Sequence, residues 1–256
     1  MALVTGASSG IGAAYAERLA STGHDLVLVA RRADRLESLA GRLDEESGTN
    51  ARVLVADLSA ADGVRAVEQA IAGGPELALL VNNAGFSGYM PFVELPPEEI
   101  DRLVVIHCIA TARLTRAALP GMIAAGRGGV VNVASRLAFS QSLPPDPLPY
   151  RTVYAACKAF MVTFTVTLRH ELEGTGVRAM VCCPGMVETE FHGLDWKGPP
   201  RMDADDVVTA CIRGLEADEA ICVPALEDPQ VVEALHAAQR AMLGHARTTT
   251  LAERYR

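Results

Sequence analysis

The segment YRTVYAACK, residues 150–158, places Tyr150, Tyr154 and Lys158 at intervals of four residues. In a helix, residues four apart lie on the same face, one turn above the other. A phenol beside an ammonium in this position is either the edge of a mildly amphipathic helix or a proton-transfer pair. Lys158 is one turn beyond Tyr154 and two turns beyond Tyr150, so the spacing selects Tyr154. Because Pro149 precedes Tyr150, we expect Tyr150 in the incoming loop or at the helix entrance, as a candidate wall of a substrate pocket.

A glycine-rich turn, TGASSGIG at residues 5–12, follows a short apolar run and precedes a helix-like segment. Gly6 allows a tight turn, and Gly10 and Gly12 allow the backbone and a phosphate to approach closely. The N-terminus of the following helix presents unpaired N–H groups and a positive dipole to a pyrophosphate. Similar turns also occur as ordinary loops, but the position between a strand and a helix favours a dinucleotide site.

Two arginines follow the second apolar run, DLVLVA at residues 25–30. A cofactor with a free ribose 2′-hydroxyl is usually held by an acidic residue near this point. Arg31 and Arg32 stand there instead, and guanidinium groups complement a 2′-phosphate. The pattern favours NADP(H) over NAD(H), while two solvated arginines at a helix start are the alternative interpretation. Asp57, after the third run, is a candidate acceptor for the adenine amino group or a helix cap.

The elements that would position these residues are short apolar runs alternating with longer amphipathic segments. The runs cover residues 2–5, 25–30, 52–57, 77–82, 129–134, 177–183 and 220–224. Runs that are apolar throughout predict strands buried on both faces, and their alternation with helices predicts βαβ units with a parallel sheet. At 256 residues the chain fits one domain. We expect an extended surface loop in the proline-rich segment 142–150, and a C-terminal helix with a polar tail over about residues 228–256.

Composition and charge exclude several classes of protein. The net charge of −8 differs from the basic balance of a general nucleic-acid binder. No apolar run approaches the roughly 20 residues that span a bilayer, and the first residues lack the cationic start of a signal peptide. A cytoplasmic protein without a membrane or nucleic-acid partner is therefore expected. The cysteines form no CxxC pair, which favours buried reduced thiols over a disulfide framework or a zinc site, so no metal is expected. They are Cys108, Cys157, Cys182, Cys183, Cys211 and Cys222.

Six motifs in order resemble the main short-chain dehydrogenase/reductase family over almost the whole chain. They are TGASSGIG at 5–12, DL at 57–58, NNAG at 82–85, NVAS at 132–135, YAACK at 154–158 and PGMVET at 184–189. The resemblance implies an α/β fold with a Rossmann-like, doubly wound parallel sheet of about seven strands and helices on both faces. It also implies NAD(P)(H)-dependent interconversion of carbonyls and alcohols. Members of the family associate through their fourth and fifth helices, so a homodimer or homotetramer is expected.

The resemblance also assigns roles to residues. Tyr154 would act as general acid in reduction and general base in oxidation, and Ser135 would hydrogen-bond the substrate oxygen. A free phenol titrates near pH 10, and Lys158 would lower that pKa by its charge and bind the nicotinamide ribose. The expected cofactor-binding residues are Gly6, Ser8, Ser9, Ile11, Gly12, Arg31, Arg32, Asp57, Leu58, Asn83, Ala84, Gly85, Tyr154, Lys158, Pro184, Gly185, Val187 and Thr189.

His107 departs from the family pattern. The family usually places at this point an asparagine that supports a water-mediated proton relay to the lysine. An imidazole has donor and acceptor sites, so it could bind the relay water or carry protons itself. A histidine at helical spacing from Leu103 and Val104 is, however, ordinarily a satisfied core residue. Both interpretations stay open at this point.

Two loops depart from or extend the pattern near the expected substrate. The interval from Ser135 to Tyr154 is several residues longer than usual, and the excess lies in residues 140–151, where it is expected to shape specificity. Residues 185–200 match the family's substrate lid. In it, Phe191 and Trp196 are expected to pack over an apolar substrate, although they could equally dock the lid on the core.

The leading hypothesis is an NADP(H)-dependent oxidoreductase acting on a small-molecule carbonyl or secondary alcohol. One alternative is a cofactor-binding regulatory or scaffold protein with a degenerate site. Another is an enzyme of the same fold that catalyses epimerisation, dehydration or cyclisation, because fold does not fix function.

Overall fold

The computed structural model describes residues 1–192, 200–245 and 251–256. The chain divides into two compact units, Met1–Pro224 and Ala225–Arg256. The first contains the sheet and its covering helices. The second contains α8 (Gln230–His245) and the short helix η5 (Glu253–Tyr255), where a C-terminal helix was expected. The prediction of a single domain over residues 1–256 stays a prediction.

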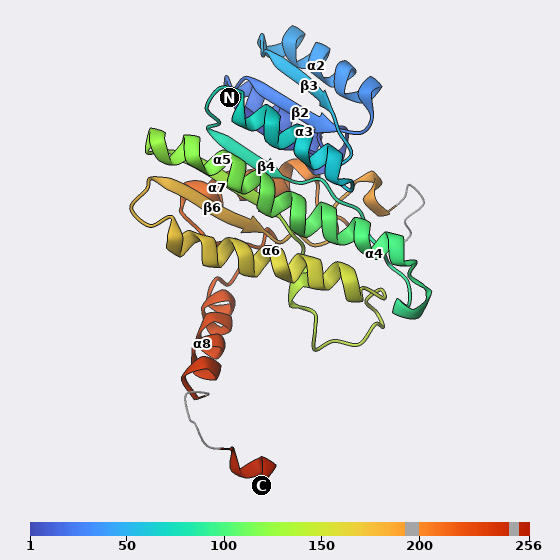
Figure 1. The fold of residues 1–256 in the computed structure, drawn as a ribbon, viewed down its shortest axis with the longest axis vertical. Helices are drawn as coiled ribbons and strands as arrows, with labels where there is room; N and C mark the ends of the chain where they lie inside the picture. Colours follow the sequence, from blue (N-terminus) through green and yellow to red (C-terminus); the bar gives the residue numbers. More distant parts are fainter. Residues whose placement is uncertain (193–199, 246–250) are drawn as a thin grey trace. The chain divides into compact units, whose positions relative to one another are not determined.

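Seven parallel strands form one sheet in the order β3-β2-β1-β4-β5-β6-β7 (Figure 1). They are β1 (Ala2–Thr5), β2 (Leu26–Ala30), β3 (Ala51–Val55), β4 (Leu79–Asn82), β5 (Gly128–Val133), β6 (Val177–Cys182) and β7 (Ile221–Cys222). Strands β1, β2 and β4 are buried at every position, which explains why their sequences are apolar throughout. The strand order reverses between β1 and β4, and ligands of open α/β sheets bind at such a point.

Helices cover both faces of the sheet. On one face α1 (Gly10–Ser21), α2 (Ala33–Ser47) and α7 (Ala204–Glu216) contribute Tyr15, Leu36 and Val207 to a continuous apolar cluster. On the other face α3 (Ala61–Ala72), α5 (Thr111–Ala125) and α6 (Thr152–Glu171) contribute Val64, Leu114 and Leu168 to a second cluster. The predicted doubly wound α/β fold is therefore confirmed.

The helical stretch Pro97–Ala125 changes its winding in the middle. It consists of α4 (Pro97–Val104), the π-helical segment η2 (Val105–Ala110) and α5. Segments of π-helix occur frequently at functional sites, and this one carries His107. The stretch is also long and apolar enough, by length and composition alone, to cross a membrane, which the sequence reading did not anticipate. Core helices of soluble proteins pass the same test, and this stretch packs on α3, α6 and the sheet.

Residues 140–151, the expected extended loop, contain no regular element and lead directly into α6. Because α6 begins at Thr152, Tyr150 precedes the helix and Tyr154 lies in its first turn, as the proline spacing predicts. The rest of the loop is described with the site below.

Candidate active site

One large cavity of about 1070 Å³ lies at the carboxyl ends of the central strands. Most of the expected site residues line it, namely Gly6, Ser8, Ser9, Ile11, Arg31, Arg32, Asp57, Leu58, Asn83, Ala84, Gly85, Ser135, Tyr154, Lys158, Pro184, Gly185, Val187, Thr189 and Phe191. Gly12, His107 and Tyr150 are outside this lining, and Trp196 lies outside the described residues. The fold therefore gathers segments from both halves of the chain around one space.

The glycine-rich turn packs closely on the NNAG segment. Gly6 has a φ of +68°, and a Cβ there would lie 2.9 Å from the Cα of Ala84. A Cβ at Gly12 would lie 2.3 Å from the carbonyl oxygen of Gly6, so Gly12 is required for packing of α1 on the turn although it does not line the cavity. Asn83 donates from Nδ2 to the Thr5 carbonyl at 3.0 Å. These contacts leave the backbone of the turn facing a space that fits a dinucleotide pyrophosphate.

The two arginines after β2 have different surroundings. Arg32 donates to Ser8 Oγ from Nε and Nη2 (3.1 and 2.9 Å) and to Ser9 Oγ at 2.8 Å, which fixes it against the glycine-rich turn. It also pairs with Glu190 at 2.8 Å, a residue that the sequence reading did not single out. Arg31 is exposed and lines the cavity. Arg31 is therefore available to a 2′-phosphate, whereas Arg32 is held in place against the glycine-rich turn.

Asp57 also lines the cavity, near the start of the connection from β3 to α3. Its Oδ1 accepts hydrogen bonds from the backbone N–H and the hydroxyl of Ser59, at 2.9 and 2.7 Å. Burial alone would raise the pKa of Asp57, but the hydrogen bonds from Ser59 and the charges of Arg31 and Arg102 lower it. The carboxylate is thus ionised and serves the local turn, whereas the N-cap of α3 is Ala60, so the helix-cap interpretation is wrong. The contact with the adenine amino group stays a prediction.

Ser135, Tyr154 and Lys158 lie together at the other end of the cavity. Ser135 follows β5, its Oγ accepts the Leu137 N–H at 3.1 Å, and its side chain hydrogen-bonds Tyr154. Lys158 donates from Nζ to the Val133 carbonyl at 2.8 Å and lies 5.5 Å from the centroid of the Tyr154 ring. All three residues are buried, and strand β5 and helix α6 fix their mutual placement.

The pKa of Tyr154 differs from the sequence expectation. Burial raises it well above the ordinary value, the neighbouring Tyr89 raises it further, and the hydrogen bond from Ser135 opposes these effects only in part. The net direction is therefore upward, because burial outweighs the stabilisation of the phenolate by the Lys158 ammonium, which lies 5.5 Å from the ring centroid. Burial lowers the pKa of Lys158 itself to about 8, so the ammonium remains largely charged at pH 7. Tyr154 is accordingly a protonated donor at neutral pH.

Tyr89 is a site residue that the sequence reading missed. Its ring meets that of Tyr154 edge-on at 5.3 Å between centroids, and the two phenols interact through a hydrogen bond. Burial raises the pKa of Tyr89 to about 12, although the bond to Tyr154 and the charge of Arg151 act in the opposite direction. The position of Tyr89 in the loop after NNAG was the one sequence feature that could have suggested a site residue. The path of the loop, however, decides which of its side chains turns toward the cavity.

His107 is completely buried beside this cluster without lining the cavity. Nε2 lies 2.9 Å from the Phe86 carbonyl oxygen, and the ring meets Tyr154 edge-on at 5.5 Å between centroids. Burial and the charge of Lys158 lower the pKa of His107 well below its ordinary value. The ring is thus neutral, with its proton on Nε2, because only a donor can bond a carbonyl. Nδ1 then carries a lone pair and has no hydrogen-bond partner within the described residues.

A buried arginine holds the proline-rich loop. Arg151 donates from Nε to Ser140 Oγ at 2.7 Å, and from its Nη atoms to the carbonyls of Ser140, Leu143 and Pro149 at 2.9, 2.9 and 3.0 Å. Residues 145–149 of this loop line the cavity, so the insertion does border it as expected. Tyr150, in contrast, is 54% exposed and outside the lining, so its expected place as a pocket wall is wrong. The sharp turn held by Arg151 directs the preceding prolines inward instead.

Comparison with known proteins decides the family. The model of the short chain dehydrogenase family matches residues 1–198. The chain belongs to this family. A short-chain dehydrogenase from Sphingobium yanoikuyae, solved in complex with NADPH, is 36% identical with a TM-score of 0.92 over 99% of each chain. The bulky-bulky ketone specific alcohol dehydrogenase from Comamonas testosteroni is 34% identical with a TM-score of 0.90, over 99% of this chain and 97% of that one.

Curated relatives of this short-chain dehydrogenase point to the same chemistry. The very-long-chain 3-oxoacyl-CoA reductase of Anas platyrhynchos is 31% identical over 229 residues, which are 87% of this chain and 72% of that protein. These relatives are reductases or dehydrogenases of carbonyls and alcohols. The protein is therefore an oxidoreductase of this type with a nicotinamide-cofactor site, which the glycine-rich turn and the cavity accommodate.

Proposed function

We propose that this short-chain dehydrogenase uses NADP(H) to interconvert a bulky apolar ketone and its secondary alcohol. The observation that carries the proposal is the buried cluster of Ser135, Tyr154 and Lys158, which opens on a cavity large enough for cofactor and substrate together. Around Tyr154 the walls are largely apolar, with Phe86, Tyr89, Leu137, Leu148, Met186 and Phe191. The NADPH complex and the bulky-ketone specificity of the two relatives support this choice.

The proposed mechanism assigns one task to each side chain. When bound, the nicotinamide cofactor supplies the hydride in reduction and accepts it in oxidation. Ser135 donates a hydrogen bond that holds the substrate oxygen beside Tyr154. Tyr154 gives its hydroxyl proton to that oxygen in reduction and takes it back in oxidation. The Lys158 charge stabilises the phenolate that remains after proton donation, while the high pKa of the phenol keeps it protonated beforehand.

A panel of ketones tests the substrate class directly. Purified protein is mixed with NADPH and uncharged ketones in which one or both substituents increase in size, and NADPH oxidation is followed. We expect kcat/KM to be highest where both substituents are bulky, because only these fill the apolar end of the cavity. Highest activity on small ketones contradicts the substrate proposal. Consumption of substrate without a net change in NADPH supports the epimerase, dehydratase or cyclase alternative.

Arg31 is expected to set the cofactor preference. Arg31→Ala should lower kcat/KM for NADPH by about 10- to 100-fold, because a hydrogen bond to a charged group contributes about 1.5–3 kcal/mol. The value for NADH should change little, since NADH has no 2′-phosphate. Arg42→Ala is the matched control, because Arg42 lies on the following helix α2 and pairs with Glu17 and Glu46. An equal loss with both cofactors would show that Arg31 supports the fold rather than the phosphate contact.

Arg151 is expected to act on substrate binding through the loop that it holds. Arg151→Met removes its bonds to Ser140, Leu143 and Pro149, so the cavity wall loses its fixed position. We expect KM for a bulky ketone to rise about tenfold, the equivalent of about 1.4 kcal/mol, with NADPH affinity unchanged. Arg178→Met is the control, because Arg178 also bonds backbone carbonyls, those of Leu215 and Glu216. A wild-type KM in Arg151→Met would show that the loop keeps its path without the guanidinium.

We also propose self-association through the outward faces of α5 and α6. Ile123 and Phe160 are 43% and 39% exposed there, and Ile109 of the adjoining π-segment is 43% exposed. Light scattering of the purified protein tests this, and a monomer at micromolar concentration would contradict it.

A further inference from the structure

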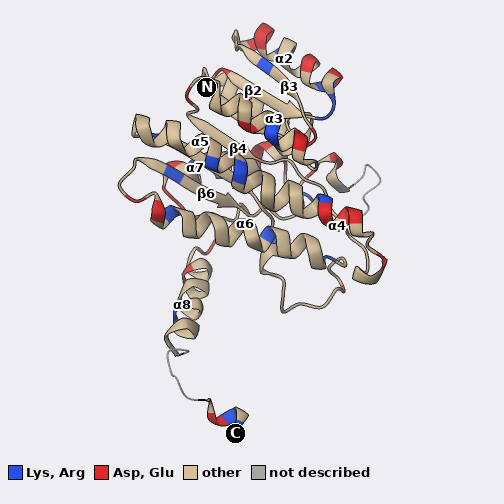
Figure 2. Ribbon diagram, viewed as in Figure 1, with Lys and Arg blue, Asp and Glu red and all other residues tan. Residues whose placement is uncertain are grey.

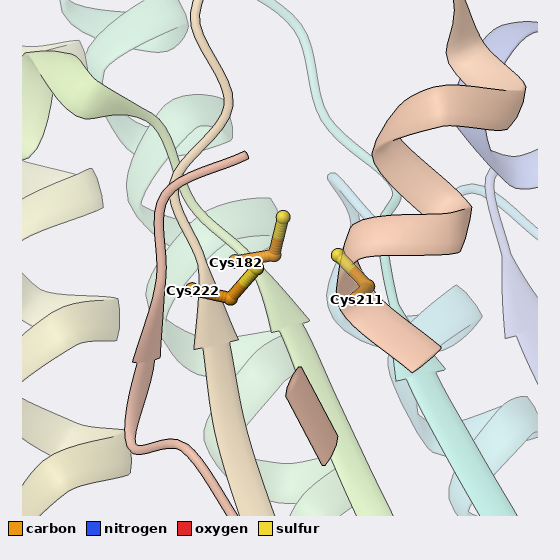
Figure 3. A group of neighbouring side chains, drawn as sticks. All are labelled: Cys182, Cys211 and Cys222. Atoms are coloured by element: carbon orange, nitrogen blue, oxygen red, sulfur yellow. The ribbon is translucent and has the colours of Figure 1, made fainter. Parts of the chain in front are cut away.

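Three cysteines far apart in the sequence meet inside the first unit. Cys182 ends β6, Cys222 ends β7 and Cys211 lies in α7, and their sulfur atoms are all within 4.8 Å of one another. Figure 3 shows Cys211 pointing from its helix toward the two strand cysteines. Their exposed fractions are 0%, 0% and 4% for Cys182, Cys211 and Cys222. They belong to the core on the α1 and α7 face of the sheet, whereas α6, which carries Lys158, packs on the other face.

A second polar group, the Tyr15 hydroxyl, faces this cluster and among the described residues meets only the thiol of Cys211. The hydroxyl of Tyr15, on α1, is fully buried and has no hydrogen bond of normal geometry within the described part of the chain. The polar groups around it are the thiols of Cys211, Cys182 and Cys222. Buried hydroxyls nearly always find a partner, because leaving one unpaired is costly. A sulfur with greater negative charge than a thiol would satisfy this donor.

Further sulfur borders the same space. A Cβ at Gly214 would lie 3.0 Å from Glu219 Oε2, 3.1 Å from Met180 Sδ and 3.5 Å from the Cβ of Cys222. Met180 precedes Cys182 by two residues on β6, so both side chains leave the same face of the strand. Gly214 thus keeps α7 close to the cysteines, and Glu219 borders them without belonging to the group of three within ligating distance of one another.

We propose that Cys182, Cys211 and Cys222 bind one Cu(I) ion. Thiolate and thioether ligands select soft ions such as Cu(I). Metal–sulfur bonds of about 2.3 Å place the sulfurs of a trigonal site about 4 Å apart, so the three thiols need only a small inward shift. A structural zinc ion takes four ligands, and no histidine or carboxylate joins this group within the described residues.

Binding of the ion is coupled to proton release from the thiols. Each thiol that ligates Cu⁺ gives its proton to solvent, so the ion and three thiolates carry a net charge of −2, less negative than three free thiolates would be. The Tyr15 hydroxyl then donates to a thiolate sulfur, a stronger acceptor than the Cys211 thiol that it meets in the metal-free chain. Partners of this kind typically change metal affinity 10- to 100-fold. Strand β7 has two residues and lies at the sheet edge, so local opening there gives the ion a path.

Competition with a chelator tests the site. The full-length, reduced protein is titrated without oxygen into Cu(I) bound to bathocuproine disulfonate, and loss of the coloured chelate measures transfer. We expect one equivalent to move to wild-type protein, Cys211→Ser to reduce the affinity at least 100-fold, and Tyr15→Phe to reduce it about tenfold. Cys108→Ser is the matched control, with one thiol removed outside the cluster, and should bind like wild type.

Two results would overturn the proposal. One is equal Cu(I) affinity in wild type and Cys211→Ser, and the other is loss of binding in Cys108→Ser. Circular dichroism and NADPH turnover show whether each variant is folded. If Cys211→Ser does not fold, X-ray absorption of Cu(I)-loaded wild type decides instead. Three sulfur neighbours at about 2.3 Å support the site, and nitrogen or oxygen neighbours refute it.

Discussion

Replacing Tyr154 with phenylalanine is expected to lower kcat for ketone reduction about a thousandfold. The substitution removes one hydroxyl, with its hydrogen bonds to Ser135 and Tyr89, and leaves the ring contacts with Tyr89, His107 and Phe191 in place. Proton transfer by a positioned side chain typically contributes a factor of about 100 to 10,000. NADPH oxidation at saturating substrate measures the loss, and NADPH binding should be nearly unchanged.

Tyr150→Phe is the matched control for this experiment. It removes the same hydroxyl four residues earlier in the chain, from a ring that is exposed and outside the cavity. Its kcat should equal that of wild type. The wild-type rate of reduction should also fall above about pH 8, because Lys158 loses its proton there and no longer stabilises the phenolate. Full turnover by Tyr154→Phe would mean that another group donates the proton.

The fold could be read from the sequence because its signals are local and repeated. Each strand of the sheet is an apolar run between turn signals. Strands β1, β2 and β4 are buried on both faces, so their sequences show no alternation of apolar and polar residues. The predicted strand bounds differ from the observed ones by at most two residues at either end, for example at β7, where only Ile221 and Cys222 pair with β6. Pairing at a sheet edge depends on the neighbouring strand, which local sequence does not report.

The site divides into a predictable part and an unpredictable part for a physical reason. Ser135, Tyr154 and Lys158 stand on the end of a strand and the first turns of a helix, so element periodicity fixes where they point. Tyr89 and Arg151 depend on loop paths that long-range contacts determine. Tyr150 illustrates the limit, since its spacing matches that of Tyr154 while its side chain lies outside the cavity. The direction of the Tyr154 pKa was also missed, because burial is a tertiary property.

Two substitutions of the buried His107 test whether this residue takes part in proton transfer. His107→Leu should lower kcat about 100-fold, whereas His107→Asn should stay within about tenfold of wild type. The reason is the lone pair on Nδ1, which has no hydrogen-bond partner within the described residues although the ring meets Tyr154 edge-on, while Nε2 is committed to the Phe86 carbonyl. An asparagine offers both a donor for that carbonyl and an acceptor for a relay water, and leucine offers neither. Steady-state kinetics of both variants measure the difference.

Stability measured against pH, together with the turnover of both variants, distinguishes a proton relay from a purely structural histidine. The pKa of His107 is lowered in the folded chain, so below about pH 6.5 the unfolded chain binds a proton that the folded chain does not. The free energy of unfolding should therefore fall with acidification, by at most about 1.4 kcal/mol per pH unit for this residue, and both variants should lose that component. If both variants lose it and His107→Leu still turns over like wild type, His107 is a core residue. Loss of turnover in the leucine variant alone, at equal stability, assigns the lone pair to proton transfer.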